Sequence, residues 1–316
     1  MNIKGKKILV TGATGFVGAN LVRHFLKKGA NISILKRQQS NLWRIKDIIN
    51  QISVCNADLL DYARVNKAVK RIRPEVIFHA AAYGGHVTQD NPTRILKTNF
   101  DGTVNLLDAC LKRGFGLFVN TGSSSEYGIK DSPMKESDLL NPVTLYGISK
   151  AAASIYCQYA AKKHSLPIVT LRLFSPYGYF DDGSRAISYI ILSCLKTKTV
   201  NISSPDSVRD FIFIDDVVDA YEKALERSSK MSEGIFNIGS GKQRSIEKLA
   251  GKITRAVDNN IVVKYPKKSS ARIEPKSWVA DISKSHAGLK WKPRFNIDEG
   301  LSKTIDWFRE NKGLYS

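Results

Sequence analysis

The sequence predicts an α/β fold, in which a parallel, doubly wound sheet carries helices on both faces and a smaller α+β domain follows. Two observations lead to this prediction. Short apolar segments alternate with longer segments of helical periodicity in the first part of the chain, and strands that alternate with helices form parallel sheets. Beyond about residue 172 the alternation stops, and shorter segments are separated by proline-bearing turns.

The first strand and the first helix flank a turn rich in glycine. We expect a buried strand at 7–11 and a helix at 15–28, closed by Gly29. Between them, glycines let the backbone approach a phosphate, and the helix N-terminus supplies free N–H groups. The alternative is an ordinary tight turn. The turn therefore predicts a site for the pyrophosphate of a dinucleotide, formed by Gly12, Thr14, Gly15, Phe16, Val17 and Gly18.

The alternation continues as far as residue 173. Further strands are expected near 31–35, 52–55, 75–79, 116–121 and 167–173, and further helices near 60–72, 92–113 and 145–164. The last helix begins after the turn signal Asn141-Pro142 and contains a run of three alanines, which are strong helix formers.

Tyr146 and Lys150 lie four residues apart on this last helix. That spacing puts both side chains on one face, about 5–6 Å apart at Cβ. A phenol with a pKa of about 10 is a poor proton donor or acceptor at neutral pH, and a neighbouring ammonium lowers that pKa. The pair is a candidate general acid–base site. The alternative is a solvated helix face.

The composition favours a cytoplasmic, water-soluble protein. No apolar run reaches the roughly 18–20 residues of a membrane helix, and the N-terminus has no signal-peptide pattern. Cys55, Cys110, Cys157 and Cys194 are far apart among apolar neighbours, so we expect buried thiols and no metal site. The net charge of +20 comes from dispersed Lys and Arg. We expect no membrane and no nucleic-acid partner, although nucleic-acid binding is the alternative that such a charge raises.

A series of motifs gives the chain a resemblance to one family. In order, they are Thr11 to Gly18, Asp58 to Asp61, His79 to Ala82, Thr98 to Thr103, Ser123 to Gly128, Tyr146 to Lys150, Leu171 to Leu173 before Tyr177-Gly178, Arg209 to Phe211, and Phe236 to Gly239. The chain resembles the extended short-chain dehydrogenase/reductases that act on nucleotide sugars, the NAD-dependent epimerase/dehydratase family. The resemblance covers nearly all 316 residues. It implies a Rossmann-type dinucleotide domain at 1–172, a substrate domain at 173–316, and a return of 208–240 to the first domain.

The resemblance also implies catalytic roles. Tyr146 would be the general acid–base, and Lys150 would hold the nicotinamide ribose and lower the pKa of the phenol. Ser123 would hydrogen-bond the reacting oxygen, with Ser124 and Ser125 as neighbours that could share the role. The residues that the resemblance assigns to the cofactor, beyond the glycine turn, are Asp58 and Leu59, Ala80, Ala81 and Ala82, and Asn99. Of these, Asp58 would meet the adenine, and Asn99 resembles a family residue whose role is more structural than chemical.

Lys36 and Arg37 end the second predicted strand, where relatives that prefer NAD carry an acidic residue for the ribose hydroxyls. Two cations would instead pair with a 2′-phosphate. We therefore expect NADP(H) to be preferred, with NAD(H) as the other possible cofactor. The alternative is that both cations are solvated loop charges.

One departure from the family pattern bears on the reaction type. Sugar 4,6-dehydratases carry a catalytic Glu two residues before the Tyr-Gly pair, whereas Glu126 stands directly before Tyr127. On an extended segment this shift would turn the side chain to the opposite face, so a dehydratase is disfavoured. Lys36 and Arg37 favour a reductase of a nucleotide-linked 4-keto-6-deoxysugar, in glycan or lipopolysaccharide precursor synthesis. A 4-epimerase with tightly bound cofactor and a catalytically silent cofactor-binding protein are the alternatives.

The resemblance finally implies substrate contacts and an assembly. The substrate would be a nucleoside-diphosphate sugar, and the protein would be a homodimer joined through the helices at 92–113 and 145–164. The residues expected near the substrate are Tyr83, His86, Ser175, Tyr177, Arg209 and Arg272. Among them, Ser175 stands where the family generally has Asn, and the segment after Arg272 departs from the family spacing.

Overall fold

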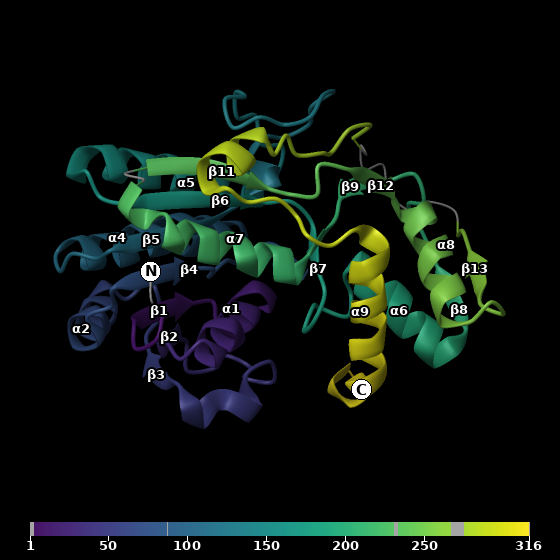
Figure 1. Ribbon diagram of the computed structural model, residues 1–316, viewed down its shortest axis with the longest axis horizontal. Helices are drawn as coiled ribbons and strands as arrows, with labels where there is room; N and C mark the ends of the chain where they lie inside the picture. The colour runs from purple at the N-terminus through teal and green to yellow at the C-terminus, as the bar shows by residue number, and fades with distance from the viewer. Residues whose placement is uncertain (1–2, 87, 231–232, 267–274, 316) are drawn as a thin grey trace.

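The central sheet has seven parallel strands in the order β11-β6-β5-β4-β1-β2-β3 (Figure 1). The computed structural model describes residues 3–86, 88–230, 233–266 and 275–315. The strands of this sheet are β1 (Lys7–Thr11), β2 (Asn31–Lys36), β3 (Ser53–Asn56), β4 (Val76–His79), β5 (Leu117–Ser123), β6 (Ile168–Leu173) and β11 (Glu233–Ile238). The six strands expected before residue 174 are confirmed, with ends that differ by no more than two residues.

Helices cover both faces of this sheet. They are α1 (Phe16–Lys27), α2 (Tyr62–Ile72), α3 (Pro92–Leu96), α4 (Gly102–Leu111), α5 (Leu145–His164) and α7 (Ile214–Glu226). α1 packs against α7, whereas α4 contacts α2 and α5. Because side chains of a strand alternate between faces, Ile8 and Val10 join the apolar cluster of α1 and α7, and Leu9 joins that of α2 and α4. This arrangement confirms the predicted doubly wound, Rossmann-type sheet.

The expected helix at 92–113 contains a wide turn that the sequence pattern did not indicate. A π-helical turn (η2, Lys97–Asp101) joins α3 to α4, and the helix ends at Leu111. Such a turn inserts one residue into the helical ladder and often occurs at functional sites. Here it carries Asn99, whose buried amide contacts the loop after β4.

The C-terminal half supplies helices and pairs of short strands beyond the carboxyl ends of the central strands (Figure 1). They are α6 (Ala186–Thr197), α8 (Ile246–Val257) and α9 (Ile297–Glu310), with the strand pairs β7 (Pro176–Tyr177) and β10 (Ile212–Phe213), β8 (Thr199–Asn201) and β13 (Val262–Lys264), and β9 (Val208–Asp210) and β12 (Gln243–Ser245). α6 packs against α8 and α9, while β11 leaves this half and pairs with β6. The division into domains at residue 172 stays a prediction.

The order of the strands defines where a ligand is expected. β1 lies between β2 and β4, so the chain leaves β1 toward one side of the sheet and later returns on the other side. In open α/β sheets, ligands bind at the carboxyl ends of the strands at such a switch point. The glycine turn follows β1 at this position.

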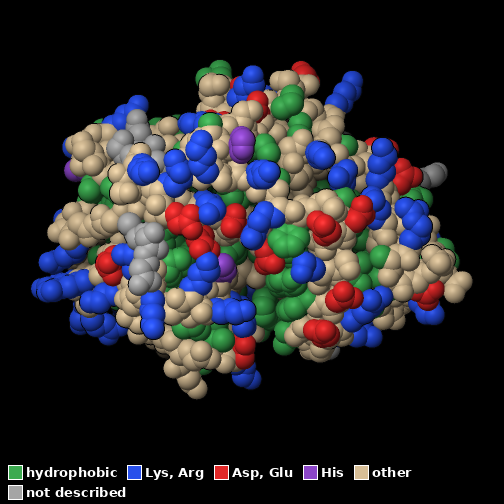
Figure 2. Space-filling model, viewed as in Figure 1, with side chains coloured by type: hydrophobic (Ala, Val, Ile, Leu, Met, Phe, Trp, Pro, Cys, Tyr) green, Lys and Arg blue, Asp and Glu red, His purple; other side chains and the backbone are tan. Residues whose placement is uncertain are grey.

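The cysteines and the surface charges agree with the sequence prediction. All four cysteines are buried and free, and burial raises the pKa of Cys110 and Cys157 to about 12. They are therefore core residues. Figure 2 shows Lys and Arg side chains scattered over one face of the molecule, with acidic side chains among them. Within the described ranges, no helix has the length and apolarity needed to cross a bilayer.

Candidate active site

Three adjoining cavities form a cleft at the carboxyl edge of the sheet. The central cavity measures about 510 Å³. A cavity of about 300 Å³ beside β2 shares the glycine turn with it, and one of about 660 Å³ beside α6 shares Ser175, Arg185 and Arg209. The cleft therefore joins the glycine turn to the C-terminal half.

The glycine turn is closely packed, and only glycine fits two of its positions. Gly12 has a φ of +68°, and a Cβ there would lie 2.5 Å from the carbonyl carbon of Ala80. A Cβ at Gly18 would lie 2.2 Å from the carbonyl oxygen of Gly12. Gly15 is the N-cap of α1 and has no side chain to cap the helix. The N-terminus of α1 is therefore open toward the central and β2-side cavities, both of which Gly15 lines. This turn is a cradle suited to a phosphate group.

Ser123, Tyr146 and Lys150 all line the central cavity. Ser123 is the last residue of β5, while Tyr146 and Lys150 occupy successive turns of α5. Thr144 fixes the start of α5, because its hydroxyl accepts a hydrogen bond of 3.0 Å from the Gly147 N–H. Two separate elements thus bring together the three residues that the sequence predicted to be catalytic.

The charge environment of Tyr146 differs from the expectation. Burial raises the pKa of the Tyr146 phenol, and the opposing influences come from Arg185 and from a hydrogen bond with Ser123. Lys150 is not among the groups that act on this pKa, and the cost of burying a phenolate outweighs the influences that lower it. The lowering of this pKa by Lys150 therefore stays a prediction. The cation that faces the phenol is Arg185, at the start of α6.

Lys150 is only 2 % exposed. Within the described part of the chain, its ammonium forms no hydrogen bond and no ion pair. Burial lowers its pKa, and the charge that raises it again is that of Glu126. A buried ammonium without a partner in a cavity is a group prepared to bind a ligand. This arrangement fits the predicted contact between Lys150 and a ribose.

The β2-side cavity gathers four cations around one acid. Lys36, Arg37, Arg44 and Arg94 line it together with Asp58. Lys36 donates to the carbonyls of Arg37 and Gln38 at 3.2 and 3.4 Å. The sequence pointed to Lys36 and Arg37, but Arg44 and Arg94 carried no motif or spacing signal. Thr14, Leu59, Ala80, Ala81 and Ala82 also line this cavity, while Phe16, Val17 and Gly18 line the central one.

Asn99 acts on the site indirectly. Its amide accepts from the Tyr83 N–H at 2.8 Å and donates to the Tyr83 carbonyl at 2.7 Å and to the Ser149 hydroxyl at 2.8 Å. Both amide protons are therefore in use. Asn99 ties the loop after β4 to α5, so it positions the loop and the helix that carries Tyr146.

The residues predicted to contact the substrate occupy different parts of the cleft. His86 lines the central cavity, and its ring bonds to Thr88 and Ser184 at 2.8 and 2.6 Å. Tyr83 lies instead in the β2-side cavity, under the guanidinium of Arg94.

Ser175 and Arg209 lie where the central and α6-side cavities meet. Tyr177 is buried in the core and reaches the α6-side cavity. Arg272 lies outside the described residues.

Trp278 and Arg185 are cleft residues that the sequence did not reveal. The Trp278 indole N–H donates to the Ser124 hydroxyl at 3.1 Å, and the Arg209 guanidinium lies 5.3 Å from the centre of its ring. Trp278 thus closes the central cavity from the C-terminal half, and Arg185 lines the passage toward α6. Neither residue belongs to a recognisable motif, so only the fold brings them to the site.

Glu126 lies in a different local structure from the one expected. Ser124–Glu126 form a 3₁₀ turn, not an extended segment, so the argument from strand alternation does not apply. Glu126 is fully buried and pairs with Arg172 at 2.7 Å. Its carboxylate is thereby committed to the interior.

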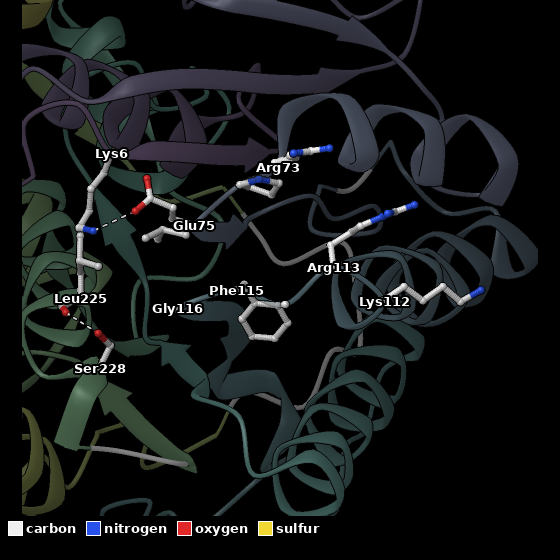
Figure 3. Close-up of a pocket in the computed structure, with 12 residues that line it drawn as sticks. Lys6, Arg73, Glu75, Lys112, Arg113, Phe115, Gly116, Leu225 and Ser228 are labelled. Atoms are coloured by element: carbon white, nitrogen blue, oxygen red, sulfur yellow. Dashed lines mark hydrogen bonds and ion pairs between the residues drawn. The ribbon is translucent and has the colours of Figure 1, made fainter.

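A further cavity of about 500 Å³ lies at the opposite, amino edge of the sheet. Figure 3 shows Lys6 paired with Glu75 on one side of it, while Lys112 and Arg113 extend away from that pair. None of the residues predicted to be functional lines it. The chemistry of the chain is therefore concentrated at the carboxyl edge.

The fold is that of the extended short-chain dehydrogenase/reductases, and the structure brings the glycine turn, Ser123, Tyr146 and Lys150 together at one cavity. A model of the NAD dependent epimerase/dehydratase family matches residues 8–239, and the chain belongs to that family. Its relatives include a UDP-glucose 4-epimerase, a trifunctional protein with UDP-glucose 4,6-dehydratase activity, and a dTDP-4-dehydro-6-deoxyglucose reductase.

Three similar proteins illustrate this range. An Escherichia coli dTDP-4-dehydro-6-deoxyglucose reductase is 25 % identical, with 98 % of this chain and 99 % of the relative covered. The structure of an epimerase from Methanothermobacter thermautotrophicus has a TM-score of 0.88 at 28 % identity, covering 99 % and 94 %. The UDP-glucuronic acid 4-epimerase of Bacillus cereus, solved with UDP-glucuronic acid and NAD, has a TM-score of 0.85 at 26 % identity, covering 96 % and 99 %.

Proposed function

We propose that this protein reduces the 4-keto group of a nucleotide-linked 6-deoxysugar with NADPH. The observation that carries the proposal is the convergence of Ser123, Tyr146 and Lys150 on one cavity beside the glycine turn. These residues fit a dinucleotide, because a Cβ at Gly12 or Gly18 would collide with the backbone that shapes the cradle. In addition, the Lys150 ammonium lines the cavity and has no hydrogen-bond or ion-pair partner among the described residues. We place the protein in the cytoplasm, where its cofactor and nucleotide sugars are available.

The bound dinucleotide supplies a hydride, and the chain supplies binding, orientation and a proton. In the proposed reaction, the Tyr146 phenol donates its proton to the C4 oxygen, and the Ser123 hydroxyl hydrogen-bonds the same oxygen. Lys150 holds the ribose beside it. The raised pKa of Tyr146 keeps the phenol protonated at neutral pH, which suits a proton donor.

The preference for NADP(H) rests on the four cations of the β2-side cavity. Replacing Lys36 and Arg37 together by Ala should weaken NADP binding by about 10- to 100-fold, because charge-assisted hydrogen bonds to the 2′-phosphate are lost. NAD binding should change little. Fluorescence titration of both cofactors measures this, with Lys67→Ala/Lys70→Ala on α2 as a control of equal charge. Equal losses for the two cofactors, or better binding of NAD by the parent protein, would contradict the preference.

A 4-epimerase is the second candidate. Epimerases are prominent among the similar structures, and more than one of them was solved with NAD. An epimerase oxidises and re-reduces the same carbon, so Ser123, Tyr146 and Lys150 would serve it equally well. A 4,6-dehydratase is disfavoured, because the Glu126 carboxylate is bound to Arg172 and to the backbone of Ser123.

Absorbance at 340 nm separates the two candidates. Purified protein, NADPH and a panel of nucleotide-linked 4-keto-6-deoxyhexoses are mixed, and the sugars are analysed in parallel. Stoichiometric loss of NADPH with a new 6-deoxysugar identifies a reductase. Formation of a sugar isomer without added cofactor identifies an epimerase, and the absence of both reactions would refute the proposed chemistry.

We propose that Arg209 and Arg185 hold the diphosphate of the substrate and that Trp278 bounds its sugar. Replacing Trp278 by Ala should raise KM by about 5- to 50-fold, because the aromatic surface and its anchor on Ser124 disappear, and should admit bulkier sugars. Trp278→Phe keeps the ring and should have a smaller effect. Steady-state kinetics on the substrate panel provides the measurement. An unchanged KM and an unchanged substrate range in Trp278→Ala would exclude this role.

We propose a homodimer formed through α3, α4 and α5. Leu96, Leu145, Ile148 and Ile155 are large apolar side chains on these helices that remain 39–56 % exposed, and a second copy would cover them. Size-exclusion chromatography with light-scattering detection should give twice the monomer mass for the parent protein. The double variant Ile148→Asp/Ile155→Asp should give the mass of the monomer. A monomeric parent protein at micromolar concentration would rule the dimer out.

A further inference from the structure

Glu126 is a buried carboxylate to which the proposed reaction gives no task. It is 0 % exposed, and its partner Arg172 on β6 is 2 % exposed. Oε1 accepts the Ser123 N–H at 2.8 Å, and Oε2 accepts the Arg172 Nε–H at 2.7 Å. A Cβ at Gly122 would come within 2.7 Å of Oε1. The glycine thus leaves room for a carboxylate beneath the end of β5.

This carboxylate fixes the backbone of Ser123. The Ser123 hydroxyl in turn accepts the Ser125 N–H at 3.1 Å, so the two residues form a capping box around the 3₁₀ turn. In this bond the Ser123 hydroxyl is the acceptor and not the donor, so its own proton remains available for Tyr146 or the reacting oxygen. The turn therefore sets the orientation of the Ser123 hydroxyl.

The negative charge of Glu126 also raises the pKa of Lys150. On α5, the charge of Glu126 acts on Lys150, Tyr146 and Cys157. Its ion-pair partner is Arg172 on β6, and it also acts on Tyr127. Lys150 interacts electrostatically with Cys157 and His79 as well, and Tyr146 with Arg185. Among the described residues, Glu126 is thus the carboxylate that acts on Lys150.

We propose that the Glu126–Arg172 ion pair is a positioning element of the catalytic centre, which orients Ser123 and keeps Lys150 as an ammonium ion. The proposal rests on the proposed function only in giving Ser123, Tyr146 and Lys150 their chemical tasks. Arg172 holds the carboxylate in place with Nε, and its Nη1 has no hydrogen-bond partner among the described residues. Although it is paired with Arg172, the carboxylate still acts on Lys150 and Tyr146 of α5.

The sign of the effect follows from the charges. Glu126 raises the pKa of both Lys150 and Tyr146, so Glu126→Gln lowers both. Reduction requires both groups to be protonated, and the alkaline limb of kcat/KM should therefore move to lower pH, by about one unit. Glu126→Asp keeps the charge but shortens the reach to Ser123. It should keep the alkaline limb of the parent protein and lower kcat by about tenfold or more.

Glu136→Gln is the matched control. Glu136 is a partly buried carboxylate that accepts the Asn237 N–H at 2.7 Å, and it faces Tyr127 and Lys284, not the groups on α5. Its pH profile should equal that of the parent protein. A folded Glu126→Gln variant with the kcat and alkaline limb of the parent protein would overturn the proposal.

Two further measurements keep the test independent of folding and of turnover. If Glu126→Gln does not fold, the double variant Glu126→Gln/Arg172→Gln can replace it, because it leaves no unpaired buried charge. The alkaline limb of its kcat/KM should still lie at lower pH than that of the parent protein. An unshifted limb counts against the proposal. The affinity for NADP⁺ between pH 6 and about 10 needs no sugar substrate. As the pH rises, the affinity of Glu126→Gln for NADP⁺ should begin to fall at a lower pH than that of the parent protein. Coincident curves of affinity against pH would overturn the proposal even if no sugar is turned over.

Discussion

Tyr146→Phe should lower kcat by about 10²–10⁴-fold while leaving cofactor binding unchanged. The phenol is the proposed proton donor, and a positioned general acid contributes a factor of this size. Phe preserves the ring that packs near Gly85 and removes only the hydroxyl. Kinetics on the identified substrate, together with fluorescence titration of NADPH, would measure the two quantities separately.

Tyr159→Phe provides the control for this change. Tyr159 lies on the same helix, α5, but it is 54 % exposed, so its hydroxyl should be dispensable. If Tyr146→Phe retained most of the turnover, another group would have to donate the proton. If it lost cofactor affinity as well as turnover, Tyr146 would be shaping the site and not serving as the acid alone.

Local sequence patterns were sufficient to predict the sheet and the glycine turn. Residues such as Ile8 to Val10 and Leu21 to Phe25 carry the strand and helix periods directly, and Gly12 and Gly18 occupy positions where a Cβ collides with backbone. The periods and the contact between Gly18 and Gly12 involve neighbours in sequence, so they can be predicted without knowledge of the tertiary structure. The contact of Gly12 is with Ala80, in the loop after β4, and only the folded chain reveals it.

The rest of the cleft depends on contacts between distant segments. Trp278 reaches Ser124 across 154 positions of sequence, and Arg44 binds the Phe180 carbonyl across 136. No local period encodes such pairs, so Trp278, Arg44 and Arg185 were missed. The 3₁₀ turn at Ser124–Glu126 was missed for a different reason. Its capping box joins Ser123 to Glu126, whereas the sequence pattern predicts a continuation of the strand.

The raised pKa of Tyr146 shows that local sequence patterns do not predict electrostatics either. A spacing of four residues on a helix predicts proximity to Lys150, but it carries no information on how deeply the phenol is buried. Desolvation opposes the charged form of both groups, so it raises the pKa of Tyr146 and lowers that of Lys150. Their protonation thus depends on Arg185 and Glu126, which other parts of the fold supply.

Gly18→Ala should abolish dinucleotide binding and destabilise the protein by about 1–3 kcal/mol, the usual cost of an overpacked interior. The new Cβ would lie 2.2 Å from the Gly12 carbonyl oxygen and 2.9 Å from the Ala13 Cα. Neither atom belongs to a flexible side chain, so α1 and the turn would have to separate. That separation enlarges the cradle in which the N-terminus of α1 meets a phosphate.

Gly251→Ala makes the same substitution in helix α8, where the new Cβ would meet only the Arg255 side chain at 3.6 Å. Here the higher helix propensity of Ala should stabilise the protein by up to about 1 kcal/mol, with NADPH affinity unchanged. Thermal unfolding and NADPH titration of both variants compare the two sites. Because the substitutions are chemically identical and their expected effects opposite in sign, a Gly18→Ala protein that unfolds and binds NADPH like its parent would show that the glycine turn is not the phosphate cradle.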